Sequence, residues 1–158
     1  MNLEILLVGA SVRSWNLALE RLTKKFDSLS SEELEREVAP GKNRLIYLFG
    51  HLLAVDDSMF ATLRLGDRLY PELDALFLKA ADRTVTLPPA SELKHKWAEV
   101  HERLNAALAK LTPAEWVDRH ASVSEEDFAK EPHRNRIALL QSRTWHLGYH
   151  MGQIVLVK

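Results

Sequence analysis

The sequence contains no cysteine among its 158 residues. This excludes disulfide bonds, thiolate metal ligands and a thiol nucleophile supplied by the chain, and it fits a reducing compartment such as the cytoplasm. The sequence also lacks an excess of charge of either sign, because 21 Lys and Arg oppose 22 Asp and Glu and the net charge is −1. We therefore expect neither nucleic acid nor an anionic membrane surface as a partner.

Long hydrophobic runs are lacking as well. Residues 1–8 are apolar, but they lack the positive charge that begins a signal peptide, and Glu4 and then Arg13 interrupt the apolar stretch. No run approaches the length of a membrane span. The composition, 46% hydrophobic and 27% charged, is typical of a soluble globular protein. At this length we expect one domain, covering residues 1–158, in the cytoplasm.

Helical periodicity is what the sequence does contain. Residues 2–27 are predicted to form a helix whose apolar side chains recur at steps of 3 and 4, and we expect this whole stripe in the core. The stripe consists of Ile5, Val8, Val12, Trp15, Leu19, Leu22, Phe26 and Leu29. Three more long helices are predicted with good N-caps: 44–66 after Asn43, 92–110 after Ser91, and 135–158 capped by Asn135.

The intervening segments predict shorter elements. Ser30 with Glu33, and Thr112 with Glu115, form capping boxes that begin two short helices. Residues 116–132 have no period and are predicted to be a loop. A short packed turn of helix is expected at Leu73, Leu76 and Phe77. Each half of the chain has a long helix, a capped short helix and a histidine-bearing long helix, so we predict an all-α four-helix bundle with crossover connections.

Histidine spacing gives the clearest functional signal. His146 and His150 lie four residues apart in the last predicted helix, so their imidazoles project from one face and can bind a common metal ion. Gln153 continues that face. Gly148 and Gly152 indicate close approach of a neighbouring helix, because glycine inside a helix costs about 1 kcal/mol relative to alanine. The alternative is a pair of surface histidines on a terminal helix.

A third histidine, His51, falls at the edge of the apolar face of the second predicted helix. It is next to Gly50, which permits close contact between helices. His51 is either a core residue bonded to a backbone carbonyl or a ligand that meets the other two histidines across the bundle.

Other polar and aromatic residues carry weaker expectations. Asp56 and Asp57 are either outer-shell acceptors for an imidazole N–H or a solvated acidic patch. His95 and His101 lie off the inner stripe of their helix and are expected in solvent. The tryptophans expected in the core or at the rim of a pocket are Trp15, Trp97 and Trp145.

The histidine motifs resemble those of the DinB/YfiT-like superfamily of four-helix-bundle proteins. The matching segments are Gly50-His51-Leu52-Leu53 and His146-Leu147-Gly148-Tyr149-His150-Met151-Gly152-Gln153-Ile154. The order of the motifs, their spacing and the flanking Gly-Gln agree together, and the resemblance covers essentially the whole chain. It implies a three-histidine metal site formed by His51, His146 and His150.

The resemblance also bounds the chemistry. Members of the superfamily resemble thiol S-transferases that use bacillithiol, mycothiol or glutathione, or thiol-dependent isomerases, and many have no known activity. Three imidazoles leave a divalent ion with open positions, which is typical of a catalytic site. Zinc or nickel suits these ligands, and iron or manganese can also bind them. We expect a small-molecule thiol S-transferase, with a metal-dependent hydrolase and a non-enzymatic metal-binding or stress-associated bundle as alternatives.

Supporting residues are predicted more loosely. Gln153 can hydrogen-bond a water or the substrate, or simply pack between helices. Tyr47 can donate to an anion or simply pack against its neighbours. Arg143, one turn before His146, can meet a carboxylate of a thiol co-substrate or form a surface salt bridge. No residue is a convincing general base, so the catalytic residues are not assigned. The wide apolar faces of the first and last helices predict a homodimer.

Overall fold

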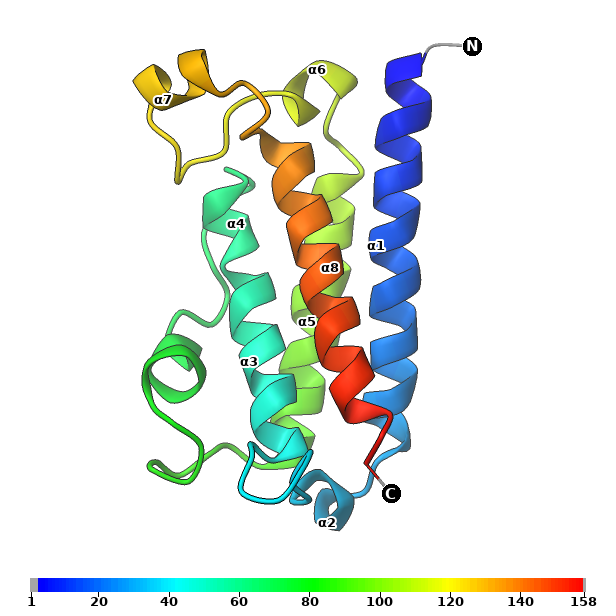
Figure 1. The fold of residues 1–158 in the computed structure, drawn as a ribbon, viewed down its shortest axis with the longest axis vertical. Coiled ribbons are helices and arrows are strands. Elements are labelled where there is room, and N and C mark those ends of the chain that lie inside the picture. Colours follow the sequence, from blue (N-terminus) through cyan, green and yellow to red (C-terminus); the bar gives the residue numbers. More distant parts are fainter. Residues whose placement is uncertain (1–2, 158) are drawn as a thin grey trace.

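The computed structural model describes residues 3–157, and four long helices lie side by side in it (Figure 1). The long helices are α1 (Leu3–Ser28), α3 (Leu45–Asp57), α5 (Ala90–Leu108) and α8 (Arg136–Ile154). The shorter elements are α2 (Ser31–Leu34), α4 (Met59–Thr62), the π-helix η1 (Ala75–Lys79), α6 (Pro113–Trp116) and α7 (Glu125–Lys130). The described residues include no β-strand, so the predicted all-α class is confirmed. Residues 1–2 and 158, which the predicted domain and terminal helices include, lie outside the described residues.

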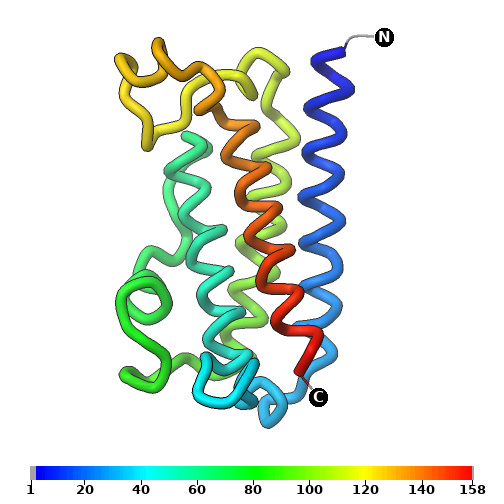
Figure 2. Tube along the Cα trace, in the orientation of Figure 1, coloured from blue at the N-terminus to red at the C-terminus, as the bar shows by residue number. Residues whose placement is uncertain are grey.

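Helices α3 and α8 contact each other and run in opposite directions. In the view of Figure 1, α1 and α8 run downwards, whereas α3 and α5 run upwards. Helix α1 packs on α8, and α3 packs on α5 and contacts α8. Between α4 and α5 the chain returns along the bundle (Figure 2), and on this return path η1 packs against α3.

Both predicted capping boxes are present. Glu33 N–H donates to Ser30 Oγ at 3.1 Å, and Ser30 N–H donates back to the Glu33 carboxylate at 2.9 Å. Thr112 and Glu115 exchange the same two hydrogen bonds at 3.2 and 2.8 Å. After each short helix the chain forms one isolated antiparallel bridge, Glu37 with Arg44 and Arg119 with Asn135. The same order of elements that the sequence predicts in each half of the chain is therefore also found in the structure.

Of the three N-caps predicted for the later long helices, two are wrong. Helix α3 has Arg44 rather than Asn43 as N-cap, because the Asp82 carboxylate accepts the Arg44 backbone N–H at 2.8 Å and its guanidinium at 2.6 Å. Helix α5 already includes Ser91 and has no side-chain cap. Asn135 caps α8 as predicted, with its Oδ1 accepting a backbone N–H at 3.0 Å.

Three predicted segments also have different bounds. The last helix, predicted over 135–158, ends at Ile154. The second long helix is broken at Ser58, between α3 and α4, and ends at Thr62 rather than residue 66. The predicted loop 116–132 contains α7, which begins after Ser124, whose Oγ accepts the Asp127 N–H at 3.0 Å. A helix of 6 residues is too short to display a hydrophobic period.

The core has a reciprocal pair of tryptophans between α1 and α5. Trp15 Nε1 donates to Asn105 Oδ1 at 3.0 Å, and Trp97 Nε1 donates to Thr23 Oγ1 at 2.8 Å. Both rings are buried, and each indole N–H has the partner that burial requires. Trp145 differs from the prediction, because its side chain is 70% exposed and stacks on the exposed Tyr149.

The first turns of α1 are exposed rather than buried. Full burial of the apolar stripe begins at Trp15, whereas Ile5 is 58% exposed and Val8 and Val12 are only partly buried. The predicted stripe needs a partner along its whole length, and at this end the neighbouring elements bury Val8 and Val12 only in part. Leu3, Leu6 and Leu7 are exposed there too. This apolar end is a surface that the homodimer prediction could use, and the homodimer stays a prediction.

One segment contradicts the expectation that no run approaches a membrane span. Leu45–Thr62 is long and apolar enough by composition, but 78% of it is buried within the bundle. The segment comprises α3, Ser58 and α4, and it lies in the core of the bundle. Its burial on nearly every side explains why its sequence is apolar almost without interruption.

Candidate metal centre

Three histidine side chains from two helices converge in the space between α3 and α8. His51 comes from α3, and His146 and His150 come from successive turns of α8. The Nε2 atom of His146 lies 3.3 Å from Nε2 of His51 and 3.0 Å from Nε2 of His150. All three potential ligand atoms lie within 4.8 Å of one another. The structure therefore brings the three predicted ligands together.

The hydrogen bonds of the outer ring nitrogens fix which nitrogen carries the lone pair. A carbonyl can only accept, so His51 Nδ1–H donates to Phe77 O at 3.1 Å. His150 Nδ1–H donates to Gln153 Oε1 at 2.7 Å. In the neutral form of each ring Nε2 is then the unprotonated atom, and the Nε2 atoms of both rings face Nε2 of His146. The two interpretations of His51 are thus compatible, since the bond to the carbonyl orients the ring with Nε2 towards the other two histidines.

This donor set fits a divalent transition metal. Tetrahedral coordination at the usual Zn–N distance separates two imidazole nitrogens by about 3.3 Å, close to the separations found here. The outer Nδ1 of His146 is buried and has no hydrogen-bond partner among the described residues. The cluster contains three His, Cys, Asp or Glu residues and no fourth within the part of the chain that the structure describes.

Electrostatics favours the neutral form of His146 and His150. Burial, reinforced by the neighbouring His150, His51 and Arg143, lowers the pKa of His146 to about 4. Burial also lowers the pKa of His150, against the opposing effect of its bond to Gln153. Metal ions bind the neutral imidazole, so at neutral pH these two rings are already in the ligating form.

The π-helix supplies the acceptor for His51, and Gly50 makes room for it. A Cβ atom on Gly50 would lie 2.1 Å from the buried ring of Phe77, so the predicted close contact at Gly50 is confirmed, although its partner is η1. Tyr47 Oη–H donates chiefly to Ala80 O at 2.8 Å, and Phe77 O lies 3.3 Å from the same oxygen. Tyr47 therefore helps to hold the segment that orients His51, and burial raises the pKa of its hydroxyl.

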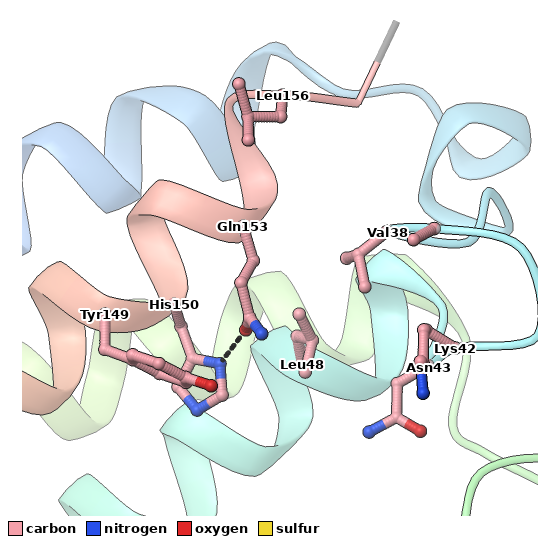
Figure 3. Close-up of a pocket in the computed structure, with 9 residues that line it drawn as sticks. Val38, Lys42, Asn43, Leu48, Tyr149, His150, Gln153 and Leu156 are labelled. Atoms are coloured by element: carbon pink, nitrogen blue, oxygen red, sulfur yellow. Dashed lines mark hydrogen bonds between the residues drawn. The ribbon is translucent and has the colours of Figure 1, made fainter.

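A pocket of about 390 Å³ opens beside the cluster (Figure 3). His150, Gln153 and Tyr149 of α8 line one side of it, and residues of the loop between α2 and α3 line the other. Its lining residues are Val38, Ala39, Lys42, Asn43, Leu48, Tyr149, His150, Gln153 and Leu156. A small molecule in this pocket would lie next to one of the three imidazoles, in a cavity of the size that proteins use for such ligands.

The remaining predicted contacts lie apart from this pocket. Arg143 does not line it; its Nε is buried without a partner among the described residues, and its charge helps to lower the pKa of His146. Gly148 and Gly152 are exposed, and an added Cβ would meet nothing within 4 Å. The predicted close approach of a helix at these two glycines is therefore wrong.

A buried acid–imidazole pair was missed by the sequence interpretation. His101 was expected in solvent, but only 5% of it is exposed, and its Nε2 lies 2.9 Å from Asp56 Oδ2. Its Nδ1–H donates to Trp97 O at 2.8 Å. Burial raises the pKa of Asp56. The signal available in the sequence was the position of His101 one turn after Trp97, beside the inner stripe.

Asp57 is also fully buried and belongs to no acidic patch. Its carboxylate accepts the Arg68 Nε–H at 3.0 Å and the Leu69 N–H at 2.8 Å. It therefore fixes the start of the return path from α4 to α5. His95, by contrast, is exposed as predicted.

Comparison with known families agrees with this architecture and this cluster. The family model of the DinB superfamily matches residues 14–154, which include all three histidines. The chain therefore belongs to the DinB superfamily. A search of curated proteins found no match.

Removing the acceptor of His150 should weaken metal binding. Gln153→Ala leaves the Nδ1–H without its 2.7 Å partner, so the ring loses its fixed tautomer and orientation. Loss of such an outer partner typically lowers metal affinity about 10- to 100-fold. Gln153→Glu keeps an acceptor and should retain most of the affinity. Competition with a chelating indicator measures both variants, and Gln141→Ala, on an exposed part of the same helix, is the control. Equal affinities for Gln153→Ala and Gln141→Ala would contradict this role.

The metal-free protein should lose stability in mild acid. A lowered pKa means that the unfolded chain takes up protons on these histidines before the folded chain does, so the stabilisation is complete above pH 6.5 and declines as the pH falls towards 4. For His146, which is only half buried, the loss between pH 6.5 and 5 is about 1 kcal/mol once solvent screening is allowed for. Urea denaturation at pH 7 and pH 5, with chelator present, measures it. His146→Gln should flatten the difference, and an unchanged slope in that variant would contradict the assignment.

Proposed function

We propose that this protein is a metal-dependent enzyme that joins a low-molecular-weight thiol to an electrophilic small molecule. The observation that carries the proposal is the convergence of three imidazole Nε2 atoms beside a pocket that His150 also lines. A closed structural site commonly takes a fourth protein ligand, whereas a catalytic site keeps that position for a small molecule. The three-ligand cluster supports the second kind.

His51, His146 and His150 would hold the ion. Imidazole ligands favour zinc or nickel, and iron(II) or manganese(II) are compatible with them. When bound, the ion supplies Lewis acidity, which lowers the pKa of a small-molecule thiol or water. Phe77 O and Gln153 Oε1 keep two of the rings in the tautomer that presents Nε2.

The remaining chemistry falls to the pocket and the co-substrate. The sulfur must come from an external thiol, because the chain has no cysteine. Its S–H proton passes to solvent, since no Asp or Glu lines the pocket among the described residues. The sulfur then bonds to the electrophilic carbon, and the leaving group departs with its bonding pair. Such thiols belong to reducing compartments, and we propose the cytoplasm as the location.

Elemental analysis of the untagged protein, after dialysis against a weak chelator, tests the site. About one equivalent of zinc, nickel or iron is expected in the parent and none in His51→Ala. The loaded parent is then assayed with glutathione and 1-chloro-2,4-dinitrobenzene, and with other thiols, for metal-dependent thioether formation. Metal without thioether formation but with ester hydrolysis would favour a hydrolase. No metal after reconstitution would leave a non-enzymatic bundle.

A further inference from the structure

We propose that the pocket beside His150 contains an anion subsite at Lys42, so that its preferred ligand is a thiol bearing a carboxylate. The inference rests on the proposed function and specifies the substrate class of the same site. Three observations support it: the charges that line the pocket, the position of Lys42 opposite His150, and the hydrogen bonds that hold the loop of Lys42 in place.

Among the residues 3–157 that the structure describes, Lys42 is the one permanently charged side chain that lines the pocket. The acidic residues close to it in sequence are engaged elsewhere: Glu37 pairs with Arg83 at 2.7 Å, and the Glu35 carboxylate binds Arg44. Within the described residues Lys42 has no ion-pair partner. Its ammonium group is therefore available to a ligand anion.

The position of Lys42 suits a ligand that spans the pocket. Figure 3 shows Lys42 and Asn43 on the side opposite His150 and Gln153, with Leu48 between the two sides. The Asn43 side-chain amide makes no hydrogen bond within the described residues and is free to donate an N–H. The lining would match a ligand of three parts. Its sulfur would lie at the side of His150, a short apolar chain would lie over Leu48, and an anionic group would lie at Lys42.

The loop that carries Lys42 is held in place. Gly41 has φ +74°, a left-handed conformation that favours glycine, and its N–H donates to the Glu37 carboxylate at 2.8 Å. Lys42 N–H donates to Ala39 O at 2.9 Å, and Val38 N–H donates to Asn43 O at 3.0 Å. A fixed backbone reduces the entropy lost when Lys42 binds an anion.

Three small probes separate the thiol from the charge. They are 3-mercaptopropionate, the neutral 3-mercaptopropanol, and butyrate, which has a methyl group in place of the thiol. Titration calorimetry with zinc-loaded protein at low ionic strength measures their affinities. The parent should bind 3-mercaptopropionate about fivefold more tightly than 3-mercaptopropanol, the size expected for a solvent-accessible ion pair. Added salt should reduce that preference.

Variants of Lys42 assign the preference to this side chain. Lys42→Ala should abolish it, and Lys42→Glu should reverse it, while zinc content and far-UV circular dichroism stay unchanged because Lys42 is exposed in a loop. Lys110→Ala, at an exposed position near the end of α5, is the matched control and should keep the preference.

The outcomes distinguish the two proposals. Equal affinity for both thiols, or a preference that survives Lys42→Ala, overturns the anion subsite and leaves thiol transfer standing. Butyrate binding as tightly as 3-mercaptopropionate, with the same dependence on Lys42, supports the subsite and overturns the thiol as co-substrate. Failure of all three probes to bind overturns both.

Discussion

His146→Ala should abolish stoichiometric metal binding while the protein stays helical. His146 is the shared neighbour of the other two ligands, because its Nε2 lies 3.3 and 3.0 Å from theirs. Two imidazoles would remain, and we expect the affinity to fall at least about 100-fold. Elemental analysis after dialysis against a weak chelator measures the metal content, and far-UV circular dichroism measures the helicity.

A distant histidine provides the control for this experiment. His95 is exposed on α5, so His95→Ala should keep about one equivalent of metal. If His146→Ala retains the metal content of the parent and of His95→Ala, the ligand set is wrong. Metal must then be held elsewhere, and the proposed function loses its principal support.

Gly50→Ala should destabilise the fold and weaken metal binding together. The added Cβ would lie 2.1 Å from the Phe77 ring, which is fully buried and cannot turn away into solvent. Overpacking of this kind typically costs about 1–3 kcal/mol, and here a backbone shift of η1 would also displace the carbonyl that orients His51. Urea denaturation of the metal-free protein measures the first effect, and zinc competition measures the second.

Gly148→Ala is the matched substitution. Gly148 is also inside a helix, but its Cβ would meet nothing within 4 Å, so this variant should be more stable by about 0.5–1 kcal/mol. The same change thus has opposite expected signs at two helical glycines. Gly50→Ala with the stability and zinc affinity of the parent would show that η1 does not control His51.

The sequence predicted those features that repeat with the period of a helix. The buried stripe from Trp15 onwards and the shared face of His146 and His150 follow directly from steps of 3 and 4 residues. The capping boxes were predictable because both partners lie within one turn. For His51, family resemblance was needed, since its own position at the edge of an apolar face was ambiguous.

Features that depend on chain segments far apart in sequence could not be predicted. The acceptor of His51 is the backbone carbonyl of Phe77, 26 residues later, and a carbonyl leaves no residue-specific signal. The N-cap residue of α3, Arg44, is held by a carboxylate 38 residues away, at Asp82. The glycines of α8 were misinterpreted because low helix propensity indicates close contact only where a neighbouring element exists, and at Gly148 none does.

The separation of the ligands along the chain has a consequence for folding. His51 and His146 are 95 residues apart, so an ion held between them would join the two halves of the polypeptide as a reversible cross-link. Because the chain has no cysteine and cannot form a disulfide, this ion would be a cross-link between distant parts of the chain, as disulfides are in other small proteins. Closing a loop of that length restricts the unfolded ensemble by about 4–5 kcal/mol in the chain-entropy model. Binding of the metal ion would therefore raise the melting temperature of the protein, in addition to any role of the ion in catalysis.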